Sequence, residues 1–266
     1  MSTLNLRRAT SLDDALRILH AEPRTPIAGA TDVYVALNFG QPMPTQYLDI
    51  WGLDELRTIE TRGETLVLGA LASFTSLMCS DLVADRLPML IEAARQVGGV
   101  QIQNRGTLGG NIANGSPAGD SLPVLAATDA VLVLRSATGE RRVPITAFYT
   151  GYRKNVMRVD ELITAIEVEP VVGAQYFRKV GTRAALAISK IVIAGVRNAT
   201  PRIAFGSVAP TVVRARATEQ ALASGASIDE AIAILNTEIT PIDDLRSSAA
   251  YRMRVAGNLL RRFWSS

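Results

Sequence analysis

Small and hydrogen-bonding residues gather in one stretch, positions 104 to 120, which reads NRGTLGGNIANGSPAGD. Five glycines fall within the fifteen positions from Gly106 to Asp120. Glycine allows left-handed main-chain conformations and lets a large ligand approach backbone N–H groups, which suits phosphate binding. Short neutral donors accompany the glycines at Thr107, Asn111, Asn114 and Ser116. Asp120 adds an acceptor suited to a ribose, ribityl or ring N–H group. The sequence therefore predicts a loop that holds a phosphorylated ligand.

Two common phosphate-binding motifs are missing from the chain. No Gly-x-x-x-x-Gly-Lys-Ser/Thr is present, so the lysine and the Mg²⁺-binding hydroxyl of a nucleoside triphosphatase are absent. The Gly-x-Gly-x-x-Gly of a dinucleotide-binding βαβ unit is absent as well. The predicted loop therefore belongs to a different class of nucleotide site.

The chain has one cysteine, Cys79, and one histidine, His20. A disulfide framework, a zinc site and a cysteine-ligated iron–sulfur cluster each need more ligands than this. No nucleophile–base pair is evident either. Redox chemistry in this chain would therefore depend on an organic cofactor, with no catalytic residue and no bound metal.

Composition indicates a globular protein, since 48% of the 266 residues are hydrophobic. The net charge is only +3, and the arginine pairs are scattered, which argues against nucleic-acid binding. Apolar runs such as 122–134 are interrupted by Pro123 and Asp129, so no membrane span is predicted. The N-terminus lacks the pattern of a secretory signal, so a cytoplasmic location is expected.

Hydrophobic periodicity and capping residues predict an alternation of helices and strands. Before position 170, helices are expected at 12–20, 32–39, 73–79 and 87–97, strands at 46–49, 64–68 and 161–168, and a hairpin at 130–145. The segment 171–173 is the best candidate for a linker. Beyond it, strands are expected at 174–179, 189–196 and 202–208, and helices at 217–223, 229–237 and 248–263.

A second small-residue loop, from Ile27 to Val33, precedes the first one by about eighty positions. Together with Ser116-Pro117 and Asp120, the two loops resemble those of the FAD-binding subunit of the molybdenum hydroxylases, a family that includes xanthine dehydrogenases, aldehyde oxidoreductases and aerobic carbon monoxide dehydrogenases. The resemblance covers nearly the whole chain. It includes the segments 151–154, 177–183 and 187–190.

This resemblance implies an α+β fold in two parts. Residues 1–170 would form a two-lobed FAD-binding domain of the vanillyl-alcohol oxidase/p-cresol methylhydroxylase type, with lobes at about 1–55 and 56–170. Residues 174–266 would form a small C-terminal α+β domain with a three-stranded antiparallel sheet and helices.

The resemblance also implies which residues bind FAD. The first loop would wrap the pyrophosphate with the amides of Ile27, Ala28, Gly29, Ala30, Thr31, Asp32 and Val33. The second would contact it through Thr107, Gly109, Gly110 and Asn111. Asp120 would lie near the sugar and ribityl region, Val97 beside adenine, and Ile163 and Lys179 near the flavin ring system. Ala30 stands where the family commonly has glycine, which disfavours a positive φ at that position.

The implied function is electron transfer. A large partner subunit would carry the molybdenum cofactor, and a small partner would carry two [2Fe–2S] clusters, in a heterotrimer or a dimer of heterotrimers. The flavin would pass electrons to NAD, oxygen or another carrier. The segments 148–154 and 179–183 look most like those of xanthine dehydrogenases, so a purine or related N-heterocycle leads as the substrate of the complex, followed by aldehydes and aromatic acids.

Two alternatives stay open at this stage. A stand-alone FAD-dependent oxidoreductase of the same superfamily would need its own substrate pocket and proton donor, and the last third of the chain offers no obvious candidate. A non-catalytic scaffold subunit that has lost FAD stays open because of Ala30, but it is opposed by the intact loop residues Gly29, Thr107, Gly109, Gly110 and Asn111.

Overall fold

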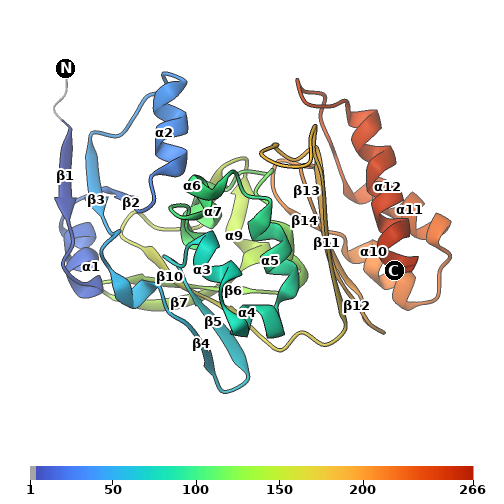
Figure 1. Ribbon diagram of the computed structural model, residues 1–266, viewed down its shortest axis with the longest axis horizontal. Helices are drawn as coiled ribbons and strands as arrows, with labels where there is room; N and C mark the ends of the chain where they lie inside the picture. The colour runs from blue at the N-terminus through green and yellow to red at the C-terminus, as the bar shows by residue number, and fades with distance from the viewer. Residues whose placement is uncertain (1–3, 266) are drawn as a thin grey trace.

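The computed structural model describes residues 4–265, in which three main sheets follow one another across the molecule, beside a small two-stranded sheet (Figure 1). The N-terminal sheet lies at one end, a five-stranded sheet lies in the middle, and the C-terminal sheet with its helices lies at the other end (Figure 1). The mixed helix and strand content agrees with the α+β class expected from the sequence.

The N-terminal lobe consists of β1 (Asn5–Arg8), α1 (Leu12–Ala21), β2 (Thr25–Ile27), α2 (Thr31–Asn38) and β3 (Gln46–Asp49). Its three strands are parallel in the order β1-β3-β2, because each connection between them passes through a helix. α1 begins at Leu12 as predicted, after the N-cap Ser11, whose hydroxyl accepts a hydrogen bond from Asp14 N at 3.1 Å. α2 differs from α1 in that none of its residues is buried.

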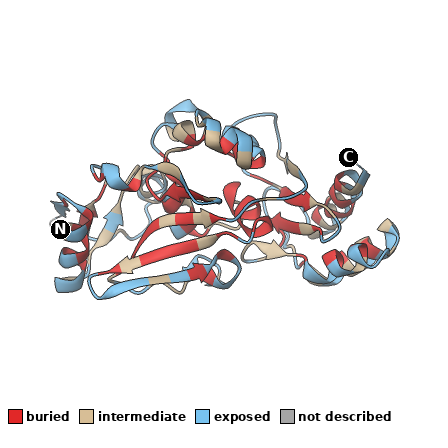
Figure 2. Ribbon diagram, turned by 90° about the horizontal axis from the view of Figure 1, so that it is seen from below, coloured by how far each residue is buried: buried red, intermediate tan, exposed pale blue. Residues whose placement is uncertain are grey.

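The second lobe is built on an antiparallel sheet in the order β4-β5-β10-β6-β7, and its central strands are largely buried (Figure 2). The strands are β4 (Ile59–Arg62), β5 (Thr65–Gly69), β6 (Val131–Ser136), β7 (Gly139–Pro144) and β10 (Leu162–Val168), and β8 (Tyr149–Gly151) pairs separately with β9 (Lys154–Asn155). The helices are a 3-10 turn (Asp54–Leu56), α3 (Phe74–Met78), α4 (Asp81–Arg86), α5 (Pro88–Arg95), α6 (Val100–Gln103), α7 (Leu108–Asn114), α8 (Ser121–Ala127) and α9 (Ile145–Phe148).

The predicted loop 104–120 is only partly a loop, because α7 occupies its centre. Thr107 caps this helix, and Gly115 ends it in a left-handed conformation with φ 59°. Leu108 and Ile112, four residues apart, are both fully buried and supply the apolar face that holds α7 in place. The density of glycine around these two residues concealed the helical spacing.

The C-terminal sheet has four strands in the order β11-β12-β13-β14, where three were expected. They are β11 (Ala174–Val180), β12 (Ile191–Arg197), β13 (Arg202–Gly206) and β14 (Val213–Arg214). The additional strand β14 has two residues, which is too short to produce a recognisable alternation. The helices α10 (Arg216–Ala223), α11 (Ile228–Glu238) and α12 (Ala249–Ser265) lie close to their predicted positions.

The C-terminal sheet is packed between two groups of helices. α12 and α10 contact β12 and β13, and α5 and α8 of the second lobe contact β11, β12 and β13. Ala194, Val196 and Ala204 therefore share one hydrophobic core with the second lobe. No helix within residues 4–265 is long and apolar enough to cross a membrane.

A buried arginine joins the C-terminal sheet to α8. Arg214 is 7% exposed, and its guanidinium donates to Asp129 Oδ1 at 2.5 Å and to Ala126 O at 2.9 Å, beside and within the end of α8. It also contacts Glu219 of α10, whose carboxylate accepts from Ile203 N at 2.5 Å. The Arg214 guanidinium thus pairs with acceptors at the end of α8 and with a carboxylate on α10 of the C-terminal part.

Replacing Arg214 by leucine should lower the free energy of unfolding by about 3–5 kcal/mol, because Glu219 would stay buried without its cation. Arg202→Leu serves as the control, since Arg202 meets the half-exposed Asp129 at 3.6 Å and should contribute less than about 1 kcal/mol. Urea unfolding followed by circular dichroism measures both variants. Equal effects would contradict the assignment of Arg214 as the main junction contact.

Candidate functional site

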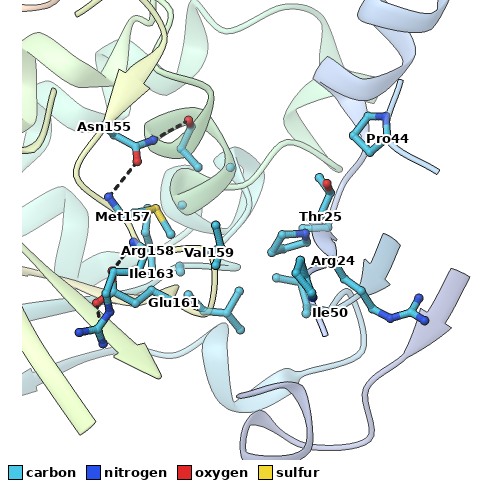
Figure 3. A pocket seen from close by; sticks show the side chains of 18 of the residues that line it. Arg24, Thr25, Pro44, Ile50, Asn155, Met157, Arg158, Val159, Glu161 and Ile163 are labelled. Atoms are coloured by element: carbon cyan, nitrogen blue, oxygen red, sulfur yellow. Dashed lines mark hydrogen bonds and ion pairs between the residues drawn. The ribbon is translucent and has the colours of Figure 1, made fainter. Parts of the chain in front are cut away.

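A cavity of about 650 Å³ lies between the N-terminal lobe and the second lobe. One wall is formed by residues on and beside β2 and β3, including Thr25, Pro44 and Ile50 (Figure 3). The opposite wall is formed by α7 and by the segment 155–163 with Met157, and Figure 3 shows these two walls facing each other. Both walls are mainly apolar, and the volume is typical of a small-molecule site.

Two adjacent glycines of α7 line this cavity but differ in their surroundings. A Cβ on Gly109 would lie 2.8 Å from both Cβ and O of Ala70, so Gly109 is required for packing of the helix. A Cβ on Gly110 would meet only Thr107 Oγ1, at 2.8 Å, and Gly110 is exposed on the cavity side. The absence of a side chain at Gly109 allows α7 to pack against Ala70, whereas the absence of a side chain at Gly110 leaves space on the cavity side.

The first amides of α7 already have acceptors. Leu108 N donates to Ala72 O at 3.0 Å and Gly109 N to Ala70 O at 2.8 Å. Gly110 N donates to Thr107 Oγ1 at 3.2 Å. α7 and its cap therefore present small residues to the cavity, namely Thr107, Gly109, Gly110 and Ala113, and the amides of residues 108–110 are already engaged.

The start of α2, in the first loop, differs from the start of α7 because it has no side-chain cap. Ala30 precedes α2 without a side-chain capping bond, so the amides of the first helical residues, Thr31, Asp32 and Val33, lack intrahelical acceptors. Ala30 has φ 63°, so the alanine has kept the left-handed conformation that was expected to be disfavoured. Retaining this conformation without glycine costs about 1 kcal/mol, which indicates that its surroundings determine the loop.

The two loops are in direct contact. A Cβ on Gly29 would fall 1.7 Å from the carbonyl oxygen of Arg105, so only glycine fits. The guanidinium of Arg105 lies 3.8 Å from the centre of the Trp51 ring, and that of Arg57 lies 4.2 Å from it. Trp51 follows β3, so this stack also joins the N-terminal lobe to the stretch before α7.

Ile163 reaches the cavity at an irregularity in β10. The pairing of β10 with β6 shifts register between Ile163 and Ala165, which marks a β-bulge at Thr164. Bulges commonly redirect a side chain next to a functional site. Ile163 is 6% exposed and lines the cavity.

A buried carboxylate fixes the wall segment 155–163. Glu161 accepts from Arg141 Nε at 2.7 Å and Nη2 at 2.9 Å, and from Arg158 N at 2.8 Å. The hydrogen bond from Arg141 is the main reason why the pKa of Glu161 is lowered. Arg141 also donates to Val156 O at 2.8 Å, so one guanidinium holds both ends of this wall.

A second group of predicted residues lies at the junction with the C-terminal sheet. Asp120 Oδ2 accepts from Lys179 Nζ at 2.7 Å, and Asp120 Oδ1 accepts from Ser189 Oγ at 2.6 Å. Lys179 also donates to Gln96 O at 3.0 Å, directly before the half-buried Val97. Burial raises the pKa of Asp120, while Lys179 and Ser189 oppose that effect.

Asn111 connects the two groups, because its Oδ1 accepts from Ser121 Oγ at 2.6 Å, next to Asp120. Of the predicted residues, the structure places Ala28, Thr107, Gly109, Gly110 and Ile163 on the cavity, and it places Asp120 and Lys179 in contact with each other. The others lie on the connecting elements outside the cavity lining, namely Ile27, Gly29, Ala30, Thr31, Asp32, Val33, Val97 and Asn111.

Several supporting residues were missed. The segment 151–154 had no assigned chemistry, yet Arg153 donates to Asn114 Oδ1 at 2.9 Å, and nearby Tyr149 Oη donates to Ile112 O at 2.8 Å. Both bonds hold the last turn of α7. Burial raises the pKa of Tyr149 far above its ordinary range, so its hydroxyl stays a donor. No local pattern marks these residues, because each acts on a helix about 40 positions away.

The comparisons with known proteins agree with this arrangement. The family described as FAD binding domain in molybdopterin dehydrogenase matches residues 2–170, and the carbon monoxide dehydrogenase flavoprotein C-terminal domain matches residues 175–266. The chain therefore belongs to the FAD-binding subunits of the molybdenum hydroxylase family, as its two loops indicated. This membership confirms FAD as the cofactor class and an oxidoreductase subunit as the class of protein.

Individual relatives cover nearly the full length. The chain is 31% identical to the glyceraldehyde dehydrogenase medium chain of Sulfolobus acidocaldarius, with 93% of this chain and 92% of the relative covered. It is 33% identical to the xanthine dehydrogenase FAD-binding subunit of Escherichia coli O157:H7, with 96% and 92% covered. A solved structure of carbon monoxide dehydrogenase from Hydrogenophaga pseudoflava matches with a TM-score of 0.89 at 31% identity, over 98% of this chain and 95% of that one.

The cavity wall leads to a pH prediction. Because Arg141 lowers the pKa of Glu161, this carboxylate stabilises the fold above its ordinary pKa, and the contribution is lost as the pH falls through the lowered value. Glu161→Gln should cost about 1–3 kcal/mol at neutral pH, and the difference from wild type should shrink below about pH 4. Melting temperatures at several pH values test this. A difference independent of pH would contradict the role of the charge.

Proposed function

We propose that FAD binds across the cavity and the two loops, with its pyrophosphate where Gly29 and Arg105 meet. The direct contact of the two loops carries this proposal, because Gly29 lies against Arg105, while Ala28 of the first loop and Gly110 of the second both line the cavity. The amides of Thr31–Val33, which have no intrahelical acceptors, follow Gly29 directly in the chain. Amides at a helix N-terminus suit a phosphate anion. The apolar walls suit the flat rings of the cofactor.

The remaining predicted residues would act around this core. Ile27, Ala28, Gly29 and Ala30 would follow the pyrophosphate, and Thr107, Gly109, Gly110 and Asn111 would face it from the other loop. Ile163 would contact a ring in the cavity. Asp120, Lys179 and Val97 would serve the sugar, ribityl and flavin region at the junction with the C-terminal sheet. We place the FAD-binding domain at 1–170, its lobes at about 1–55 and 56–170, and the C-terminal domain at 174–266.

The chain would work as an electron-transfer subunit. When bound, FAD would supply the redox chemistry, in which two electrons pass to the acceptor. The residues of the chain position the cofactor and exclude water from it. Within residues 4–265 no group of three or more histidine, cysteine or acidic residues forms a metal site, so molybdenum and iron–sulfur centres would have to come from partner chains.

We propose that these partners are an iron–sulfur subunit and a molybdenum-cofactor subunit in a heterotrimer or a dimer of heterotrimers, with NAD or another carrier as acceptor. A purine or related N-heterocycle is the proposed substrate of the complex. The similarity to a xanthine dehydrogenase subunit supports it, while the comparable similarity to a glyceraldehyde dehydrogenase subunit keeps aldehydes second. A cytoplasmic location stays a prediction from the sequence.

Co-purification tests this function. The chain, expressed in its native host with an affinity tag, should bring down two further chains and one FAD per copy, identified by mass spectrometry and by the flavin absorption spectrum. Hypoxanthine and glyceraldehyde, assayed in parallel with NAD and an artificial dye, would separate the substrates and the acceptors. A complex without flavin would overturn the proposal.

The two glycines of α7 provide a sharper test. Gly110→Val should remove FAD from the co-expressed complex while leaving the fold intact, because the new side chain enters the cavity near only Thr107. The measurement is the ratio of flavin to protein absorbance, with circular dichroism as the check on folding.

Gly109→Val is the matched control. It should destabilise the protein by about 1–3 kcal/mol, because the side chain meets Ala70 in the core. Stoichiometric FAD in Gly110→Val would contradict the placement of the pyrophosphate.

A further inference from the structure

We propose that Ser189 is a positioning residue that, together with Lys179, fixes the carboxylate of Asp120 toward the cofactor, so that the C-terminal sheet completes the FAD site. This inference rests on the proposed function. It assigns a role to a residue outside both loops, and it gives the last third of the chain a part in cofactor binding.

The carboxylate of Asp120 is held entirely by the C-terminal part of the chain. Ser189 Oγ donates to Oδ1 at 2.6 Å, and Lys179 Nζ donates to Oδ2 at 2.7 Å. Asp120 is 7% exposed and Ser189 is 1% exposed, so water contributes little to either bond. Each carboxylate oxygen thus has one donor, one from Lys179 near the end of β11 and one from Ser189 in the connection between β11 and β12.

The orientation of this side chain is unusual for its position. Asp120 is the residue before α8, where an aspartate ordinarily accepts hydrogen bonds from the first amides of the helix. Its side chain makes no such capping bond. The contacts with Lys179 and Ser189 therefore determine where the carboxylate points, in place of its own helix.

Both donors are fixed by their surroundings. Lys179 pairs with Val192 across β11 and β12, and its ammonium also donates to Gln96 O at 3.0 Å. The carbonyl of Ser189 accepts from Ser207 Oγ at 3.2 Å, and Ser207 N donates to Pro117 O at 2.8 Å. The backbone of Ser189 is thus held against the segment that leads into Asp120.

The hydroxyl of Ser189 also affects the charge of Asp120. Burial raises the pKa of this carboxyl, and the charged and neutral groups that oppose the shift within the described chain are Lys179 and Ser189. Without the hydroxyl, Lys179 alone would oppose burial, and the pKa of Asp120 would rise further. A serine that only filled space would not have this effect.

The test uses the co-purified complex. Ser189→Ala should weaken FAD binding about tenfold or more, which is the loss expected for one hydrogen bond to a charged group. The dissociation constant is measured by flavin fluorescence after dialysis against decreasing FAD. FAD should also be lost at a higher pH than in wild type, because the carboxyl of Asp120 would become protonated earlier. Ser189→Thr, which keeps the hydroxyl, should restore binding.

A double-mutant cycle separates positioning from packing. If Ser189 acts through Asp120, then Ser189→Ala should have no further effect on FAD binding in an Asp120→Asn background. Thr128→Val is the matched control, because it removes another buried hydroxyl, at the far end of α8, that bonds only to Val124 O and Leu125 O. This control should leave the dissociation constant within about twofold of wild type.

Three results would overturn the inference while the wild-type complex still binds FAD. They are unchanged binding in Asp120→Asn, additive losses in the double variant, or an equal loss in Thr128→Val. If the wild-type complex itself holds no FAD, the proposed function fails first. The two failures are therefore distinguishable.

Discussion

The close approach of Gly29 to the carbonyl of Arg105 is the constraint on which the site depends. A methyl group would collide at this point, so the chain can bring its two loops together only through glycine. The stack of Arg57, Trp51 and Arg105 maintains the same approach from the side. These contacts fix the N-terminal lobe against the second lobe. They therefore also fix the distance between the two walls of the cavity.

α7 contacts the core, the cavity and the segment that leads to the C-terminal sheet. Its Gly109 packs on Ala70 and its Gly110 faces the cavity, so consecutive residues serve the core and the site. Further along the helix, Asn111 accepts from Ser121, whose neighbour Asp120 contacts the C-terminal sheet. A short helix of seven residues therefore connects the cavity with the domain junction.

Features that depend on a single residue and its immediate neighbours can be inferred from the sequence. Ser11, Gly29 and the small residues around Gly110 have their roles because of their own type and position, and such roles can be inferred without a structure. The helix within 108–114 was missed because two apolar residues among glycines give a weak periodicity. The left-handed Ala30 was missed because tertiary contacts overrode the intrinsic preference of alanine.

Long-range partners could not be predicted in the same way. Asp120 and Lys179 were both expected near the cofactor, but 59 positions separate them, and no local pattern shows that they form an ion pair. The same holds for Arg141 with Glu161 and for Arg214 with Asp129. These pairings depend on how the three sheets pack, which a single sequence does not reveal.

Ion pairs with at least one buried member occur where separate parts of the chain meet. Lys179 with Asp120 and Arg214 with Asp129 lie at the junction of α8 with the C-terminal sheet, and Arg141 with Glu161 fixes the cavity wall. Buried pairs repay little of their desolvation cost, so their contribution to net stability is small. They do penalise any other alignment, because a shifted junction would leave a buried charge without a partner. In an FAD-binding subunit, charge pairs at these junctions therefore favour a single alignment of sheets that already share a hydrophobic core.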